Sequence, residues 1–538
     1  MARRGGRRGG GSVSDPDGAA RVPREVFPRR IAAAVAVGIA CWWAGRLLPF
    51  APGADVGVAC RTLFVTGLTT TCWLLMAMPI AAAALLPLAL YPLLGVASTS
   101  DTTRGYGDPI LWLFGGGFVL AQAVERCGLH RRLALGVVAR LGTQPRRLVL
   151  GFFLAATVIS TWINNTSVAL LLLPIGSVLV QRMAALRELP PRALANFGAG
   201  IMCAIAYGAS IGGIGSPIGT APNAIFFGAY EPLVAAGARQ VSFLGWVLAF
   251  LPYALVLAVV ASFCLTRFAL PLPGARLRGQ DELLREAREL GPWTPAEKRT
   301  AALFGLAVLL WITRGDVQLG AGEAIRGWAS YLVPAGRRDS FIADGSVAVL
   351  VAILAFLVPA GTPDGRRLTD WETARKMPFD LLLLLGAGVA MADAFGPTGL
   401  SAAFGETLRP LVGSVHPAVL LLVLVLAITL LSEVASNVAV ASLLMPILRD
   451  GARAAGLDPL VLMLPAVIAA SCGFMLPIAT PPNTIVFSSR LITFGQMARA
   501  GICIDLLAAL LLLPVLWFWA LPLLGVDPGQ LAAPGGPR

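Results

Sequence analysis

Short polar side chains interrupt apolar sequence at four places, which form two matching pairs. The first pair begins at Ser160 (S-T-W-I-N-N-T-S-V-A) and, 272 positions later, at Ser432 (S-E-V-A-S-N-V-A-V-A). The second pair begins at Pro217 (P-I-G-T-A-P-N-A-I-F-F) and, 260 positions later, at Pro477 (P-I-A-T-P-P-N-T-I-V-F). Amide, hydroxyl and freed backbone oxygens are ligands for a hard cation such as sodium. Helices that begin after such breaks direct partial positive charge at an anion.

The interrupted segments carry the candidate ligands. The oxygen-bearing side chains are Ser160, Asn164, Asn165, Thr166, Thr220 and Asn223 in the first half, and Ser432, Ser436, Asn437, Thr480 and Asn483 in the second. No Lys, Arg or carboxylate lies inside either triplet, so we expect an anion to be held by neutral donors, helix ends and co-bound cations. Glu433 stands beside the second triplet. We expect it to support the hairpin by a hydrogen bond, with a proton-coupling carboxylate as the alternative.

Duplication distinguishes these segments from ordinary helix boundaries. A single N-N-T before an apolar helix is typical of an N-cap, and a single T-x-P-N of a helix break. Paired interruptions at corresponding places in two halves of an apolar chain indicate the substrate site of a secondary transporter.

The composition is that of an integral membrane protein. The 538 residues are 57% hydrophobic and 13% charged with mean hydropathy +0.77, whereas soluble proteins contain about 25% charged residues. Eleven crossings are expected, at 31–50, 60–79, 81–98, 108–126, 193–237 (interrupted), 240–268, 298–313, 343–360, 378–395, 458–497 (interrupted) and 501–524. Two further segments, 147–181 and 417–449, read as re-entrant hairpins, because an inserted pair of half-spans keeps the next basic loop on the same side. The predicted fold is therefore an all-α polytopic membrane protein with an inverted repeat.

The net charge of +13 does not indicate nucleic-acid binding, because the positive residues gather in short segments between spans. Positive residues in short loops indicate how the chain is oriented across the membrane, and the eight arginines before the first span predict a cytoplasmic N-terminus. The eight cysteines lack C-x-x-C spacing and only two histidines are present, so we expect neither a disulfide framework nor a zinc site.

Several motifs resemble one known family, the divalent anion/sodium symporters, bacterial relatives of the sodium-coupled dicarboxylate, citrate and sulfate carriers. The resemblance rests on the paired triplets and turns and on three further motifs, from about residue 60 to 520. These are L-L-P-L-A-L-Y-P-L-L-G-V (85–96), G-L-H-R-R-L-A-L (128–135) and L-G-P-W-T-P-A-E-K (290–298). It implies a homodimer in the lipid of the cell inner membrane, with an elevator mechanism in which a transport domain moves against a scaffold.

The resemblance also implies a division of the chain. It consists of a basic cytoplasmic tail (1–30), scaffold helices (31–107), first-repeat transport elements (108–239), scaffold helices with a cytoplasmic linker at 267–300 (240–377), second-repeat transport elements (378–500), and a last helix with tail (501–538). Within the linker, Leu277 to Leu290 has the pattern of a solvated or interfacial helix.

Site residues carried over from the family fall into three sets. The first sodium site would use Ser160, Asn164 and Asn165 with the backbone of Gly219. The second sodium site would use Ser432, Ala435 and Asn437 with the backbone of Ala479. The substrate would be met by Asn165, Thr166, Thr220, Asn437, Thr480 and Pro481.

Two positions depart from the family pattern. Asn164 stands where the family has serine and still offers a carbonyl oxygen. Val438 stands where the family has threonine and lacks a hydroxyl that would touch the anion.

The expected function is sodium-coupled symport of a divalent anion, with a C4-dicarboxylate such as succinate as the substrate. The alternatives are symport of sulfate or another oxyanion, sodium-independent dicarboxylate exchange, a channel, and an intramembrane enzyme. We predict that the chain is not an enzyme, because neither His130 nor His416 is placed for a hydrolytic centre inside a span.

Overall fold

The computed structural model describes residues 26–140, 144–186, 189–274, 291–314, 317–318, 324–333, 342–400, 402–403, 406–407 and 416–527. The first half contains α1 (Val26–Gly45), α2 (Val56–Leu74), α3 (Ile80–Ala84), α4 (Leu86–Leu93), α5 (Thr99–Tyr106), α6 (Pro109–Cys127), α7 (Leu129–Arg140), α8 (Pro145–Ser160), α9 (Asn165–Leu186), α10 (Pro191–Ile214), α11 (Ala221–Ala235), α12 (Phe243–Cys264) and η1 (Leu265–Ala269). The second half contains α14 (Pro295–Ile312), α15 (Ala329–Leu332), α17 (Asp344–Leu357), α18 (Trp371–Ala374), α19 (Phe379–Phe395), α21 (Pro417–Val434), α22 (Asn437–Ala454), α23 (Leu460–Ala470), α24 (Pro481–Ser488), α25 (Phe494–Val515), η2 (Leu516–Ala520) and α26 (Leu521–Leu523).

The all-helical prediction is confirmed apart from one small feature. Strands β1 (Val317–Gln318) and β2 (Ala324–Ile325) form a two-residue antiparallel pair between α14 and α15. The predicted helix at 277–290, the N-terminal basic tail up to residue 25 and the C-terminal tail from 528 lie outside the described residues.

The helix breaks fall where the polar segments predict them. The first hairpin consists of α8 and α9, interrupted at 161–164, and the second consists of α21 and α22, interrupted at 435–436. The two turns separate α10 from α11 and α23 from α24. Short polar side chains favour such breaks because they can hydrogen-bond to nearby backbone groups in place of the helical partners. Proline favours them because it has no backbone N–H to donate.

The structure divides two of the expected segments differently. The span expected at 81–98 is two short helices, α3 and α4, which meet at Leu85. The broken helix expected to reach 497 ends at Ser488, and the last long helix begins at Phe494 instead of 501. Thr493 is the reason, because it forms a capping box with Gln496 that starts α25 before the apolar run.

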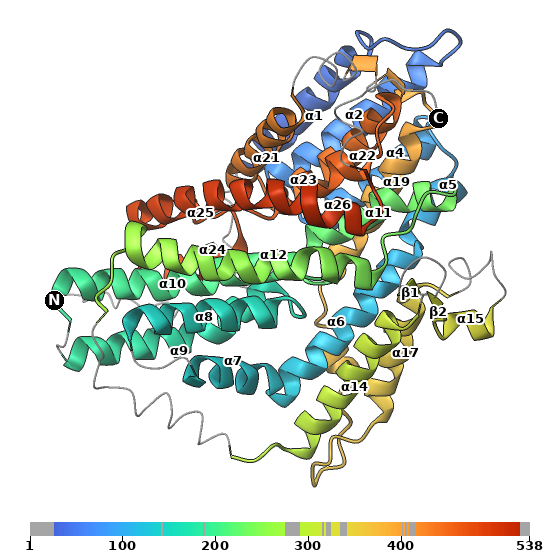
Figure 1. Cartoon of the computed structure of the whole chain (residues 1–538). Helices are drawn as coiled ribbons and strands as arrows, with labels where there is room; N and C mark the ends of the chain where they lie inside the picture. Colours follow the sequence, from blue (N-terminus) through green and yellow to red (C-terminus); the bar gives the residue numbers. More distant parts are fainter. Residues whose placement is uncertain are drawn as a thin grey trace, which may run out of the picture.

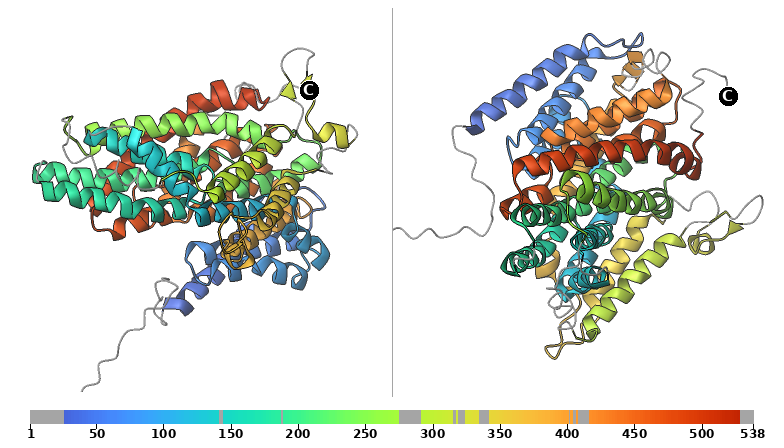
Figure 2. Two further views of the ribbon diagram at one scale, coloured as in Figure 1. Left: turned by 90° about the horizontal axis from the view of Figure 1, so that it is seen from below. Right: turned by 60° about the vertical axis from the view of Figure 1, so that its left-hand side comes forward.

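The long helices of the two halves are interleaved. Helices α12 and α25 pack side by side across the molecule, α8 and α10 pack against α12, and α9 packs against α10 and α8 (Figure 1). Helices α6, α14 and α17 form a separate bundle at one end, while α1 and α2 pair at the other. The turned views show the same grouping (Figure 2).

The hairpins and turns contact each other across the halves. Helix α9 of the first hairpin packs against α24 of the second turn, and α22 of the second hairpin packs against α11 of the first. Tyr207 in α10 contacts Phe474 in the second break, with ring centroids 5.2 Å apart. The polar breaks of both halves are therefore carried by elements that share one packed unit.

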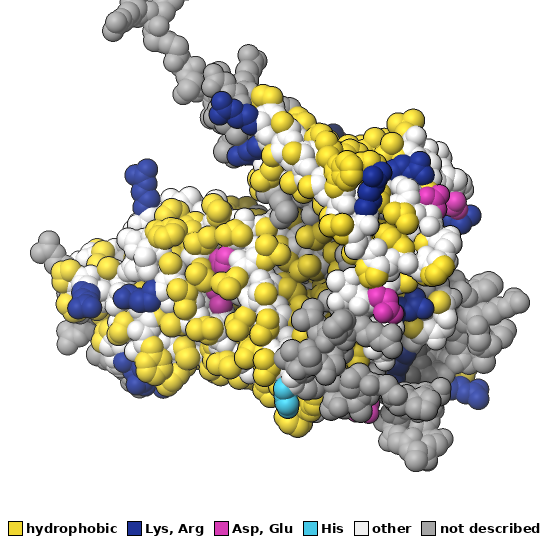
Figure 3. All heavy atoms as spheres, turned by 90° about the horizontal axis from the view of Figure 1, so that it is seen from above, with side chains coloured by type: hydrophobic (Ala, Val, Ile, Leu, Met, Phe, Trp, Pro, Cys, Tyr) yellow, Lys and Arg dark blue, Asp and Glu magenta, His cyan; other side chains and the backbone are white. Residues whose placement is uncertain are grey.

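The exterior is that of a multi-pass membrane protein. Among the described residues, five helical segments are long and apolar enough to cross a membrane: Thr99–Cys127, Asn165–Ala185, Pro191–Ile214, Phe243–Ala269 and Phe494–Leu523. Hydrophobic side chains cover most of the face seen in Figure 3, with Lys and Arg mainly toward its ends. Shorter apolar helices, such as Asp344–Leu357 and Ala418–Val434, accompany the long ones, and the total of eleven crossings stays a prediction.

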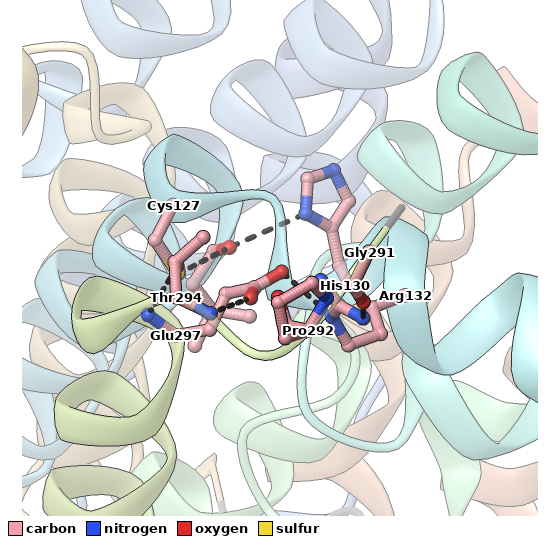
Figure 4. Close-up of polar contacts among 8 residues, drawn as sticks. Cys127, His130, Arg132, Gly291, Pro292, Thr294 and Glu297 are labelled. Atoms are coloured by element: carbon pink, nitrogen blue, oxygen red, sulfur yellow. Dashed lines mark hydrogen bonds and ion pairs between the residues drawn. The ribbon is translucent and has the colours of Figure 1, made fainter. Parts of the chain in front are cut away.

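Two of the motifs noted in the sequence meet in space. Arg132 near the start of α7 donates from Nε to Glu297 Oε1 at 2.8 Å, and its other nitrogens donate to the carbonyls of Gly291 (2.8 Å) and Pro292 (3.2 Å). Glu297 also closes a capping box with Thr294 at the start of α14 (Figure 4). This cluster fastens α7 to the first turn of α14.

Candidate functional site

The first triplet places Asn165 at the N-terminus of α9, opposite the C-terminal end of α8. Oriented with its amide nitrogen toward the surrounding oxygens, Asn165 donates to Ser160 Oγ at 2.7 Å, Ala209 O at 3.1 Å and Gly219 O at 3.2 Å. Ser160 is fully buried. The structure therefore brings together three of the residues expected at the first sodium site.

The second triplet repeats this arrangement. Ser432 Oγ lies 2.7 Å from Asn437 Oδ1 and 2.7 Å from Ala470 O, and Ser432 is fully buried. In each half, a buried serine at the end of one helix thus contacts the asparagine five residues later, where the next helix begins.

The turns are also built alike. Asn223 donates from Nδ2 to Gly213 O (3.0 Å) and Ser216 O (2.8 Å), and Asn483 donates to Gly473 O (3.0 Å) and Leu476 O (3.0 Å). The three residues of the second turn, Asn483, Gly473 and Leu476, each stand 260 positions after their counterparts in the first, Asn223, Gly213 and Ser216. Two donated bonds fix the plane of each amide, so the direction of each Oδ1 is fixed as well.

The amide oxygens of Asn223 and Asn483 are buried and accept no hydrogen bond from any described residue. A buried amide oxygen without a donor costs free energy unless another positive group approaches it. Oxygen atoms of this kind fit a cation. The sequence suggested both residues as oxygen-bearing but did not assign them to a ligand set, although their matched positions in the two turns were the available signal.

Each hairpin tip touches the turn of its own half. A Cβ built on Gly213 would lie 2.6 Å from the side-chain amide of Asn165 and 2.9 Å from Thr220 Cβ, so only glycine allows this approach. In the second half, a Cβ on Gly473 would lie 3.3 Å from both Ala479 Cβ and Ser432 O. The structure therefore gathers Gly219 and Thr220 beside Asn165, and Ala479 beside Ser432 and Asn437.

Asn164 has a local role in the structure. Its Oδ1 accepts a hydrogen bond from the backbone N–H of Thr166 at 2.8 Å, which caps the start of α9. Ala435 is buried at the end of α21, with its backbone extended.

The remaining residues expected to contact the substrate lie at the beginnings of helices. Thr166 and Val438 are half-buried in the first turns of α9 and α22, and Thr220 is half-buried at the N-cap of α11. Thr480 caps α24 by accepting from Asn483 N at 3.3 Å, and Pro481, the first residue of α24, is exposed. Four helix N-termini, from both halves, thus carry these residues.

Glu433 supports the second turn rather than its own hairpin, so the expected hydrogen-bond partner is corrected. Its carboxylate accepts the backbone N–H of Met475 on Oε1 (2.8 Å) and that of Leu476 on Oε2 (2.9 Å). The side chain crosses from the end of α21 to the break after α23, because that break leaves N–H groups without helical partners.

Comparison with known proteins gives the following matches. The family model described as the sodium:sulfate symporter transmembrane region matches residues 30–526. The sodium-dependent dicarboxylate transporter SdcS of Staphylococcus saprophyticus is 35% identical over 494 residues, covering 90% of this chain and 90% of that protein. SdcS of Staphylococcus aureus strain NCTC 8325 is 35% identical over 487 residues, covering 89% and 88%.

Two solved structures share the fold. The YdaH transporter of Alcanivorax borkumensis has a TM-score of 0.53 at 15% identity, covering 93% of this chain and 99% of its own. MtrF of Neisseria gonorrhoeae has a TM-score of 0.55 at 14% identity, covering 93% and 95%.

Proposed function

Because the chain belongs to the sodium:sulfate symporter family, we propose that it is a secondary active transporter that couples sodium to the symport of a divalent anion. A C4-dicarboxylate such as succinate is the proposed substrate, and the names of the SdcS relatives support this choice.

The duplicated oxygen cluster is the observation that carries the proposal. Each half offers a buried serine, the asparagine five residues later, a glycine- or alanine-containing turn, and a buried asparagine oxygen that no described residue satisfies. Neutral oxygen ligands suit sodium, a monovalent hard cation. We assign the first sodium to Ser160, Asn164, Asn165 and the backbone of Gly219, and the second to Ser432, Ala435, Asn437 and the backbone of Ala479.

The anion is proposed to bind between the two hairpin tips. Asn165, Thr166, Thr220, Asn437, Thr480 and Pro481 would contact it. Helices α9, α11, α22 and α24 begin at these residues, and their N-termini attract negative charge. Two bound sodium ions would cancel the charge of a dicarboxylate, which explains how the site can work without Lys or Arg in the triplets.

We further propose an elevator mechanism in a homodimer of the cell inner membrane. The transport domain would consist of the elements at 108–239 and 378–500, and the scaffold of 31–107 and 240–377; the packing of α25 against α21 supports adding this last long helix to the transport domain. The interleaved packing of α9 with α24 and of α11 with α22 supports movement of both sites as one body. The basic N-terminal segment supports a cytoplasmic N-terminus.

Sulfate is the second candidate substrate, because Val438 cannot donate a hydroxyl to the anion. The test is uptake of radiolabelled succinate and sulfate into proteoliposomes, with and without an inward sodium gradient. We expect sodium-driven succinate uptake. Sodium-driven sulfate uptake alone would establish the second candidate, and succinate exchange that ignores sodium would refute coupling.

A further inference from the structure

The two turns differ in how far their isoleucines are covered. Ile218 of the first turn and Ile478 of the second stand at the 260-residue offset of the turns, yet Ile218 is 7% exposed and Ile478 is 75% exposed. The difference continues along the helices that follow. Helix α24 carries an exposed stripe of Pro481, Thr484 and Ser488, whereas the equivalent positions on α11 are half-buried or buried. The same element is therefore covered in one half and open in the other.

Helix α6 covers the first turn. A Cβ built on Gly117 in the middle of α6 would lie 3.6 Å from Ile218 Cγ2 and 3.9 Å from Ile218 Cβ, so the isoleucine packs directly on this glycine. Helix α11, which follows the turn, packs against α6 and α19 as well as against α22 and α23. Among the described residues, α24 packs against α9 and α10, the counterparts of α22 and α23, and has no equivalent packing on α6 or α19.

Helices α6 and α19 are themselves equivalent in sequence. The segments L-F-G-G-G-F at 113–118 and L-L-G-A-G-V at 384–389 stand 271 positions apart, so Gly388 of α19 corresponds to Gly117 of α6. Apart from its own stretch of helix, no described atom lies within 4 Å of a Cβ built on Gly388. Gly388 therefore has room for an isoleucine at the place where Gly117 already holds Ile218.

Neighbouring glycines of the same two segments hold α6 and α19 against helices of the proposed scaffold. A Cβ built on Gly116 would lie 2.6 Å from Ala348 O in α17, and one built on Gly386 would lie 2.7 Å from the Tyr106 ring in α5. Only glycine allows approaches of this kind. Although both helices fall within the ranges proposed for the transport domain, these contacts join them to the scaffold. A movement of the turns against the scaffold would therefore pass along α6 and α19.

We propose that Ile218 on Gly117 and Ile478 on Gly388 are two contacts that form alternately during transport. The first contact is formed in the structure and the second is open. In the opposite conformation, Ile478 packs on Gly388 while Ile218 leaves Gly117, because an inverted repeat reaches its second state by exchanging the conformations of its halves. The inference rests on the proposed transport function and on the predicted inversion of the repeat, and it assigns α6 and α19 to the scaffold side of the moving boundary.

Disulfide formation tests the alternation in the full chain in proteoliposomes, in a variant without the eight native cysteines. The Cβ atoms of a disulfide lie about 3.5–4.5 Å apart, so Gly117→Cys with Ile218→Cys should cross-link in the conformation of the structure. Gly388→Cys with Ile478→Cys should cross-link in the opposite conformation. The crossed pairs, Gly117→Cys with Ile478→Cys and Gly388→Cys with Ile218→Cys, are the controls and should keep their thiols. Polyethylene glycol maleimide, added after oxidation and denaturation, counts the free thiols by gel mobility.

A variant with all four cysteines distinguishes alternating contacts from independent ones. Each molecule should form one disulfide and keep two thiols, because only one of the contacts exists at a time. Two disulfides in one molecule would overturn the proposal, and so would a pair at Gly388 and Ile478 that stays reduced with and without sodium and succinate. These measurements do not use uptake, so a wild type that carries no anion would refute the proposed function without deciding the outcome of this test.

Gly388→Leu gives a second readout. Leucine has room beside α19 in the structure but would fill the place proposed for Ile478. We expect Ile478→Cys to react faster with maleimide when combined with Gly388→Leu, while the melting temperature stays near that of the parent variant. Gly396→Leu is the matched control, because Gly396 also has open space beside it but lies at the C-terminal end of α19. Equal maleimide reactivity in the two combinations would contradict the packing of Ile478 on Gly388.

Discussion

Asn165 and Asn437 occupy equivalent positions in the two halves, each beside a buried serine hydroxyl. Their amides contact Ser160 and Ser432 at 2.7 Å, and Asn165 also reaches the backbone oxygens of Ala209 and Gly219. An amide at this point can both shape a cation site and meet the anion, which alanine cannot do.

We therefore expect Asn165→Ala and Asn437→Ala each to reduce sodium-driven succinate uptake to background while the protein stays folded. Uptake into proteoliposomes and size-exclusion chromatography would measure the two properties. Asn196→Ala is the control, because Asn196 donates to Pro271 O, away from both breaks, and its loss should leave uptake nearly unchanged. Uptake near the wild-type rate in either site variant would refute the placement of the site.

Val438 lies half-buried in the first turn of α22, next to Asn437. Val438→Thr adds a hydroxyl of nearly the same shape. A hydrogen bond to a charged group is worth about 1.5–3 kcal/mol, so succinate affinity should rise about tenfold or more. Competition of unlabelled succinate against labelled substrate measures this change. An unchanged succinate affinity together with better sulfate transport would contradict a dicarboxylate as the natural substrate.

At the scale of elements, side-chain hydrogen bonds and ion pairs at helix ends attach the hairpins and their flanking helices to neighbouring elements. Glu433 fastens α21 to the break after α23, and Arg132 fastens α7, which precedes the first hairpin, to α14. The ion pair of Arg132 and Glu297 is mostly buried, with side chains 13% and 5% exposed. Removing one partner of such a pair leaves a charge without compensation.

The folding stability of the protein at acidic pH should depend on Glu297, which precedes the expected span 298–313. Burial raises the pKa of Glu297, but hydrogen bonds from Arg132 and Thr294 outweigh burial and lower the pKa from its usual 4.5. A lowered pKa in the folded state contributes stability that is present above the unfolded value and is lost as pH falls through the folded value.

We expect Glu297→Gln to lower the free energy of unfolding at pH 7 by about 3 kcal/mol, and with it the melting temperature. Between pH 5 and 3, the variant should lose less of its remaining stability than the wild type does. Melting curves in detergent across this range measure both effects. Asp364→Asn is the control, because the Asp364–Arg366 pair is exposed and should contribute little. Parallel pH profiles for the wild type and Glu297→Gln would contradict this role.

For the whole molecule, the orientation of the two halves determines whether alternating access can arise from an exchange of equivalent conformations. Gln144 and His416 are the N-cap residues of α8 and α21, and they stand at the 272-residue offset of the hairpins. In an inverted repeat, these two positions lie on opposite sides of the membrane.

Single cysteines at Gln144 and His416, placed in a variant without the eight native cysteines, should therefore react with an impermeant maleimide from opposite faces. Right-side-out and inside-out vesicles distinguish the faces, and a cysteine replacing exposed Arg29 tests in the same assay the proposed cytoplasmic side of the N-terminal segment. Labelling of both hairpin positions from one face would mean a parallel duplication.

Much of this architecture was determined by the sequence alone. Long apolar runs specify membrane helices because of the cost of unpaired backbone groups in lipid, and the duplicated triplets and turns mark where helices stop. The breaks at 161–164 and 435–436 are local, so the repeated polar segments sufficed to predict them, whereas the grouping of Ser160 with Asn165 and of Ser432 with Asn437 came from the family resemblance.

Only the tertiary structure decided which distant groups meet. Side-chain types do not reveal that the Glu433 carboxylate would reach the backbone N–H groups of Met475 and Leu476. Likewise, only the folded turns bring the amide nitrogens of Asn223 and Asn483 to backbone carbonyls and bury their amide oxygens where no described residue donates to them. Contacts of this kind depend on how helices pack across the two halves, and packing is set by the shapes of many side chains together rather than by any local pattern.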